Sequence, residues 1–180
     1  MNKQAPLAAA GRPAPAALDT PTDLDRHGIA AVCQDLNLIV ADSFALFLKT
    51  KNFHWHVSGP HFRDYHLLLD EQASEILASI DPLAERVRKL GGDTLRSIGH
   101  IGRIQSIKDN NENYVAPALM LRELMADNQH VVAKLRECHA LCDKCADSAT
   151  ASLLENVIDQ AEKRIWFLFE ASRTPDRAGH

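Results

Sequence analysis

Residues 54–70 read HWHVSGPHFRDYHLLLD, and they hold four of the nine histidines of the chain. In the middle of this stretch, Ser58, Gly59 and Pro60 interrupt an apolar pattern of helical spacing. A helix is therefore expected to end near Trp55, and another is expected to begin just after the proline, near Phe62. The stretch predicts two long helices joined by a short turn, with histidines on both sides of the turn.

Apolar residues at helical spacing extend this pattern in both directions. The first helix is expected from about His27 to the region of Trp55. The second is expected from about Phe62 to Leu90, where two glycines follow a cluster of basic residues, as helix C-termini prefer.

Two more long helices are expected further along the chain. One follows Pro117, and the other runs from about Thr150 to Glu170. Residues 93–114 carry two glycines and a polar run, which predicts a connection with one short helix. Four long helices with one lengthy middle connection describe an all-α bundle with a crossover.

The composition fits one soluble domain, because 46% of the 180 residues are hydrophobic and 24% are charged. We expect a flexible Ala/Pro-rich arm over residues 1–24, the bundle over residues 25–172 and a C-terminal tail over residues 173–180. The arm has no apolar run of signal-peptide or transmembrane length, which favours a cytoplasmic protein without a membrane partner. The net charge of −4 gives no overall reason to expect strong binding to nucleic acid.

One face of the second predicted helix carries a stripe of potential metal ligands. His66 and Asp70 are four residues apart, and so are Asp81 and Glu85 further along. A period of 3.6 residues puts all four within about 100° of one another around the helix. Apolar residues flank the stripe, so we expect it to be at least partly buried.

Distance divides this stripe into two halves. Asp70 and Asp81 lie about 16 Å apart along the helix axis, at about 1.5 Å per residue. Two copies of the helix packed antiparallel about a two-fold axis would bring the His66 end of one copy to the Glu85 end of the other. His54, just across the turn, is the natural third ligand beside His66 and Asp70, and two histidines with one carboxylate suit ferrous iron.

Each half has an alternative interpretation. Isolated histidines are usually structural, so His54 and His66 could simply cap or pack helix ends. Asp81 and Pro82 could form an N-cap followed by a proline in a first helical turn, which leaves the continuity of the second helix open.

The residues between positions 51 and 92 resemble a known family, the Dps mini-ferritins or DNA-binding proteins from starved cells. The resemblance rests on Lys51-Asn52-Phe53-His54-Trp55, Gly59, Phe62, His66, Asp70, the stretch from Asp81 to Arg86, and Leu90-Gly91-Gly92. The four-helix outline extends it over nearly all of the chain after the arm.

The resemblance implies a ferritin-like four-helix bundle with a short extra helix in the middle crossover, assembled into a hollow shell of twelve copies. It implies a ferroxidase that oxidises Fe(II), preferentially with hydrogen peroxide, stores ferric mineral and protects DNA from oxidative damage. By position, the iron ligands at each two-fold interface would be His54, His66 and Asp70 of one copy and Asp81 and Glu85 of the other. Trp55 would lie beside the iron and intercept stray oxidising equivalents.

Two further observations bear on the site. Ordinary ferritin-like bundles carry Glu-x-x-His motifs within one subunit, and no such motif occurs anywhere in this sequence. An intersubunit site is favoured for that reason. His56 and His61 are more simply explained as exposed turn residues, and we do not expect them to be ligands.

Three of the four cysteines form the pattern CHALCDKC near the end of the third long helix. Cys138, Cys142 and Cys145 would share one helix face, which allows a zinc or copper site with His139 nearby. Buried thiols that fill the core are the simpler explanation. No disulfide framework is visible, as is usual in a reducing compartment.

Asp143 and Asp147 lie at the junction of the third and fourth helices, where the resembled family has acidic residues lining three-fold pores that admit iron. The alternative is that Asp147 or Ser148 caps the fourth helix.

A second function of a different class is a structural protein that coats DNA in the nucleoid. Lys3 and Arg12 are the only basic residues before Asp19, so one arm is a weak electrostatic ligand for DNA. Twelve arms on one shell could still act together.

Overall fold

The computed structural model describes residues 18–173, and in this part of the chain every regular element is a helix. The helices are α1 (Arg26–His56), α2 (Phe62–Lys89), α3 (Ile98–Ile104), α4 (Pro117–Lys144) and α5 (Ser148–Ser172). Four are long and α3 lies in the middle connection, so the predicted all-α, ferritin-like bundle with a short crossover helix is confirmed. Residues 1–17 of the predicted arm and 174–180 of the predicted tail lie outside the described part.

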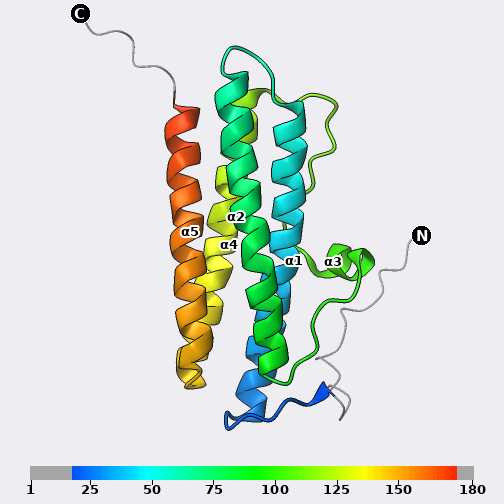
Figure 1. Cartoon of the computed structure of the whole chain (residues 1–180), viewed down its shortest axis with the longest axis vertical. Coiled ribbons are helices and arrows are strands. Elements are labelled where there is room, and N and C mark those ends of the chain that lie inside the picture. The colour runs from blue at the N-terminus through cyan, green and yellow to red at the C-terminus, as the bar shows by residue number, and fades with distance from the viewer. Residues whose placement is uncertain (1–17, 174–180) are drawn as a thin grey trace, which may run out of the picture.

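The four long helices stand side by side, with α1 and α2 as one antiparallel pair and α4 and α5 as another (Figure 1). We call the end where α1 begins and α2 ends the lower end, as it is drawn in Figure 1. From there the chain passes α3 at the side of α1 and returns to the upper end before α4 begins. The α1–α2 turn and the start of α4 therefore lie at the same end of the bundle.

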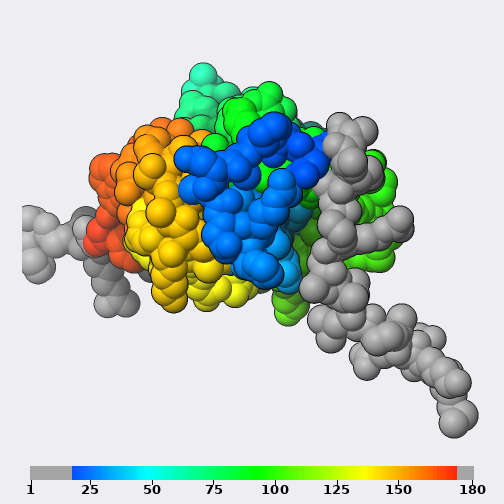
Figure 2. Space-filling view, turned by 90° about the horizontal axis from the view of Figure 1, so that it is seen from below, coloured from blue at the N-terminus to red at the C-terminus, as the bar shows by residue number. Residues whose placement is uncertain are grey.

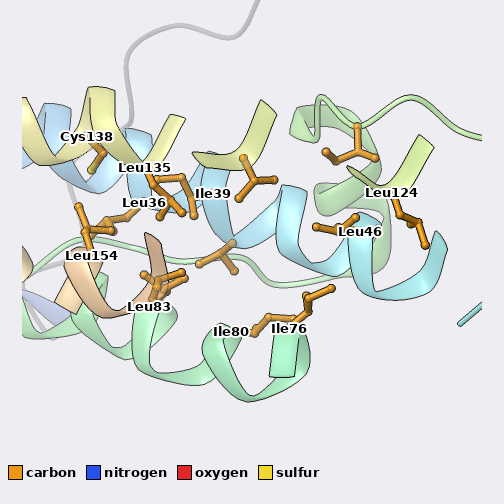
Figure 3. Close-up of a cluster of buried hydrophobic side chains, with 14 of the residues drawn as sticks. Leu36, Ile39, Leu46, Ile76, Ile80, Leu83, Leu124, Leu135, Cys138 and Leu154 are labelled. Atoms are coloured by element: carbon orange, nitrogen blue, oxygen red, sulfur yellow. The ribbon is translucent and has the colours of Figure 1, made fainter. Parts of the chain in front are cut away.

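The core consists of aliphatic side chains from all four long helices. Leu36, Ile39 and Leu46 of α1 are almost completely buried. Figure 3 shows them facing residues of the other three long helices, among which Ile76, Ile80, Leu83, Leu124, Leu135 and Leu154 are labelled. Burial of apolar surface on this scale is the main force that holds the helices together.

Buried polar side chains hold the crossover against the bundle. Asp42 of α1 is fully buried and accepts hydrogen bonds from the backbone N–H and the hydroxyl of Ser106. Lys49, also of α1, donates to the carbonyl oxygen of Lys108 at 3.0 Å and pairs with Asp127 of α4 at 2.7 Å. Because buried charges are tolerated only when they are paired and hydrogen-bonded, these contacts fix the path of the crossover.

α2 continues without a break through Pro82. The proline removes the hydrogen bond to the carbonyl of Ala78, but both residues are exposed and water can satisfy that carbonyl. Asp81 is consequently a residue of the helix interior, and the alternative that it caps a helix is wrong. The whole stripe from His66 to Glu85 lies on one continuous helix.

The lower end of α2 is closed by the segment that precedes α1. Gly91 has a φ of 80°, and a Cβ there would approach the carbonyl oxygen of Thr20 to 2.9 Å. Arg88 donates a hydrogen bond to the carbonyl oxygen of Leu18 at 2.7 Å, and Leu24 packs against the core. Figure 2 shows this segment in blue, lying across the lower end beside α4 and α5. Residues 18–24 of the predicted arm thus contact the bundle, and the boundary of the arm stays a prediction.

Asp147 joins α4, α5 and α2. Its side chain accepts a hydrogen bond from the backbone N–H of Thr150 at 3.0 Å, as an N-cap residue does, and forms an ion pair of 2.6 Å with Arg86. Only 2% of Asp147 is exposed. The capping alternative is therefore the one that the structure shows, and of the two aspartates only Asp143 is exposed at the surface.

Among the described residues, α1 alone is long and apolar enough to cross a membrane by length and composition. Half of its most apolar stretch is buried inside the bundle, and the core helix of a soluble protein meets the same criterion.

We expect the substitution Asp147→Ala to lower the free energy of unfolding by about 2 kcal/mol, because it removes a helix cap and leaves the partly buried guanidinium of Arg86 without its carboxylate partner. Asp147→Asn should cost less, since asparagine also caps helices. The measurement is urea unfolding at one protein concentration. Asp143→Ala is the matched control, and a loss as large in that variant would contradict the assigned role of Asp147.

Candidate metal centre

The turn between α1 and α2 brings His54 and His66 into contact. Their rings are stacked, with centroids 3.8 Å apart and planes inclined by 22°. Gly59 adopts a φ of 99° in this turn, a conformation that glycine reaches without strain, and so allows the chain to reverse within a few residues. The two histidines on either side of the turn, which the sequence predicts as ligands, are thus neighbours in space.

Each of these two rings is oriented by the backbone of the other residue. Nδ1 of His54 donates to the carbonyl oxygen of His66 at 2.8 Å, and Nδ1 of His66 donates to the carbonyl oxygen of His54 at 2.9 Å. A carbonyl oxygen can only accept, so the proton of each neutral ring is on Nδ1 and the lone pair is on Nε2. Metal-binding histidines are commonly oriented by such a hydrogen bond from the other ring nitrogen.

Asp70 lies next to this pair of rings. Its Oδ1 is 3.9 Å from Nε2 of His54 and 2.7 Å from Nζ of Lys51, and half of the side chain is exposed. The hydrogen bond from Lys51 holds the pKa of Asp70 below its usual value, helped by the charge of the same lysine. The carboxylate is therefore ionised at neutral pH and is paired with a cation that a bound metal would have to displace.

Asp81 and Glu85 are not part of this group in a single chain. Both are exposed on α2, and Glu85 pairs with Lys89 at 3.0 Å. Asp81 is three turns of helix away from Asp70, about 16 Å along the axis. Within residues 18–173 of one chain, no three histidine, cysteine or acidic side chains are arranged to hold a metal ion. One chain therefore presents the predicted ligands as two separate groups.

The face of α2 that carries the predicted ligands is largely uncovered. In one chain the expected partial burial holds for His66 alone, because Asp70, Asp81 and Glu85 are all exposed. Leu67 and Leu77 on the same helix are also 42% and 48% exposed. A hollow of about 440 Å³ lies beside Asp81, and its walls are mainly apolar: Val40, Phe44, Leu77, Ile80, Ala84, Thr94 and Leu95.

The remaining aromatic residues of the turn occupy distinct environments. Trp55 is 58% exposed. His56 donates from Nδ1 to the carbonyl oxygen of Asn52 in its own helix at 2.8 Å, and His61 lies against the ring of Tyr65. The exclusion of both histidines from the ligands stays a prediction.

Two contacts at the centre were not predicted. Lys51 lies one helical turn before His54, so the spacing of the two residues already places them on one face of α1. Phe62 lies against the ring of His66, with centroids 5.1 Å apart. Its partner could not be identified from the sequence, because the angle between the two helices is set by their packing.

Comparisons with known proteins agree with the fold and extend over most of the chain. The model of the ferritin-like domain matches residues 33–175. A DNA protection during starvation protein of Brevibacillus brevis is 34% identical over 74% of this chain and 89% of its own length. A low temperature-induced protein of Nostoc is 32% identical over 82% of this chain and 81% of its own length. The solved structure of DpsC from Streptomyces coelicolor has a TM-score of 0.84 and 28% identity, and covers 89% of this chain and 94% of its own.

Replacement of Lys51 by methionine should strengthen the binding of a divalent cation at the predicted site several-fold, because Asp70 loses the cation with which it is paired. The pKa of Asp70 should rise towards its usual value, yet the carboxylate stays ionised at pH 7. Titration calorimetry with Co(II), which is stable in air, measures the affinity. Lys134→Met removes a comparable surface pair on α4, with Glu137, and should leave the affinity unchanged. Equal affinities in all three proteins would show that Lys51 does not compete.

Proposed function

This chain belongs to the Dps family of ferritin-like proteins, and from that premise we propose that it is a ferroxidase that oxidises Fe(II), preferentially with hydrogen peroxide. The ferric product is stored as a mineral inside a hollow shell of twelve copies. DNA is protected because the reaction removes both reactants that would otherwise generate hydroxyl radicals. The relatives named for DNA protection during starvation are consistent with this role.

The observation that carries the proposal is the reciprocal pairing of His54 and His66. Two imidazoles are held with Nδ1 engaged and Nε2 free, beside an ionised carboxylate. A purely structural histidine pair has no need of a neighbouring carboxylate at Nε2. The donor set of two imidazoles and one carboxylate matches the ligands preferred by ferrous iron, and it leaves coordination positions for an oxidant.

The proposed site is completed by a second copy. In an isologous dimer with antiparallel α2 helices, Asp81 and Glu85 of one copy face His54, His66 and Asp70 of the other, and two equivalent sites form. The uncovered leucines of α2 and the apolar hollow beside Asp81 support contact at this face, because an exposed apolar surface next to functional polar residues is typical of an interface.

Iron is the substrate of the proposed reaction. Two Fe(II) ions each give up one electron, and one hydrogen peroxide takes up both electrons with two protons to give two water molecules. Asp70 binds the metal once Lys51 has left it, and Lys89 must release Glu85 in the same way. Fe(III) then hydrolyses, releases protons and joins the mineral.

Trp55 is proposed to protect the protein during turnover. Its exposed indole follows His54 directly in α1, so it lies near the proposed metal position. An electron from the indole can reduce an oxidising species that escapes the iron pair. The indole is left as a radical that has lost one electron, so the oxidation is confined to one residue beside the site.

A cytoplasmic location with possible association with the nucleoid is part of the same proposal. The four cysteines are free thiols, as expected in a reducing compartment. DNA coating as the main function is less well supported, since the chain carries a net charge of −4 and its predicted arm has only two basic residues before Asp19.

Replacement of His54 and His66 by alanine should slow peroxide-dependent oxidation of Fe(II) at least ten-fold, because two of the three ligands of the half-site are lost. Stopped-flow absorbance of Fe(III) measures the rate on shells whose assembly has been verified by size. His56→Ala combined with His61→Ala is the matched control, since it removes two histidines of the same turn that are not ligands. An unchanged rate in the first variant, with an intact shell, would contradict the proposed site.

The sharing of each site between two copies can be tested by mixing variants. One variant carries His54→Ala and His66→Ala, and the other carries Asp81→Asn and Glu85→Gln; each alone should be inactive. After joint refolding at equal amounts, half of the dimers are mixed and each mixed dimer has one intact site of two, so about a quarter of the wild-type activity should return. No recovery in mixed shells would show that the two ligand sets do not meet across the interface.

A further inference from the structure

The four cysteines lie towards the lower end of the bundle, far from the proposed iron site. Cys138 and Cys142 of α4 are fully buried, and Cys33 of α1 is nearly so. Cys145 is the C-cap of α4 and is partly exposed. The proposed ferroxidase reaction uses none of these thiols, although three of them form the pattern CHALCDKC.

Cys138 and Cys142 differ from the other two because they are neighbours on one helix. They are one helical turn apart on the same face of α4 and both are fully buried, so their side chains lie next to each other in the core. The interaction between the two side chains raises the pKa of Cys138 and lowers the pKa of Cys142. Figure 3 shows Cys138 among the aliphatic side chains of the core. The pair is therefore a dry, preformed arrangement of two soft donors.

We propose that Cys138 and Cys142 together form a binding site for a univalent soft cation, of which copper(I) is the one available in cells. Thiolates select soft metal ions, and copper(I) is stable with only two sulfur ligands. Zinc requires four ligands in a structural site, and no three side chains of the described residues are arranged to supply it. The number of donors thus favours copper(I) over zinc.

Binding exchanges protons for the metal ion. The two thiols release two protons in all, and one copper(I) ion forms two bonds to sulfur, with no change of oxidation state. The product carries one negative charge, whereas two free thiolates would carry two. Binding of the metal therefore lowers the free-energy cost of keeping the deprotonated pair in the core. Asp147 and Asp143 raise the pKa of Cys142 and Arg86 lowers it, so the remaining negative charge is stabilised chiefly by the bonds to the metal.

The other two cysteines are assigned different roles. Cys33 faces the backbone of Val87 at 3.9 Å, and burial raises its pKa to about 11, so it stays a thiol at neutral pH. Cys145 lies three residues after Cys142 and is partly exposed, with its sulfur close against Gly28. It is placed to receive the ion from solvent and pass it inward by one helical turn.

The test uses the reduced, fully assembled shell under anaerobic conditions, in the His54→Ala and His66→Ala background so that copper cannot bind to these histidines. Copper(I) is titrated in competition with bicinchoninate, a coloured copper(I) chelator. We expect one copper(I) retained per chain, and loss of at least ten-fold in affinity when both Cys138→Ser and Cys142→Ser are present. Cys33→Ser with Cys145→Ser is the matched control and should keep the stoichiometry and affinity, with slower uptake only.

Two outcomes would overturn the proposal. If the background shell retains no more copper(I) than the Cys138→Ser/Cys142→Ser shell, the thiols only fill the core. If the control pair loses copper equally, the site is not the one assigned. X-ray absorption of the copper-loaded background shell remains decisive should the Cys138/Cys142 variant fail to assemble: two sulfur neighbours support the site, and nitrogen or oxygen neighbours contradict it. These results are independent of whether the proposed ferroxidase reaction occurs.

Discussion

The exchange of hydrogen bonds between His54 and His66 is the interaction on which the candidate centre depends. Each ring bonds to the backbone of the other residue, so the last turn of α1 and the second turn of α2 are joined by two hydrogen bonds. The same bonds determine which nitrogen of each ring is free. A local contact that closes a helical hairpin thereby also sets the direction of two potential metal ligands, and Phe62 against His66 restricts the second ring further.

The sequence predicts the helices well because helix formation is governed by local periodicity and by turn residues. All four long helices begin and end within a few residues of the expected positions, and the glycines after α2 mark its end as predicted. Pro82 was ambiguous because a proline is compatible with both a helix start and an exposed helix interior. Whether the helix continues through Pro82 depends on whether water can reach the carbonyl of Ala78, one turn earlier. The exposure of that carbonyl is determined only when the bundle has folded.

Contacts between side chains that are far apart in the chain could not be predicted from the sequence. Arg86 and Asp147 are separated by 61 positions, and only their pairing explains why Asp147 is buried and not available at the surface. The contacts of Asp42 and Lys49 with the crossover were equally unpredictable, because nothing in the sequence distinguishes these two residues from other polar residues of α1. At the candidate centre, the helix face of the predicted ligands followed from their spacing, whereas the ion pair of Lys51 with Asp70 depends on how α1 packs against α2.

The division of the ligands along α2 has a consequence for the life of the protein in the cell. On the proposed arrangement, a newly made chain has no complete site and cannot oxidise iron. Activity appears only as copies meet, at the step that also begins to enclose a cavity. In the proposed protein, a surplus of single chains therefore does not oxidise iron. The spacing of a few side chains on one helix would thus make the reaction conditional on the first step of assembly.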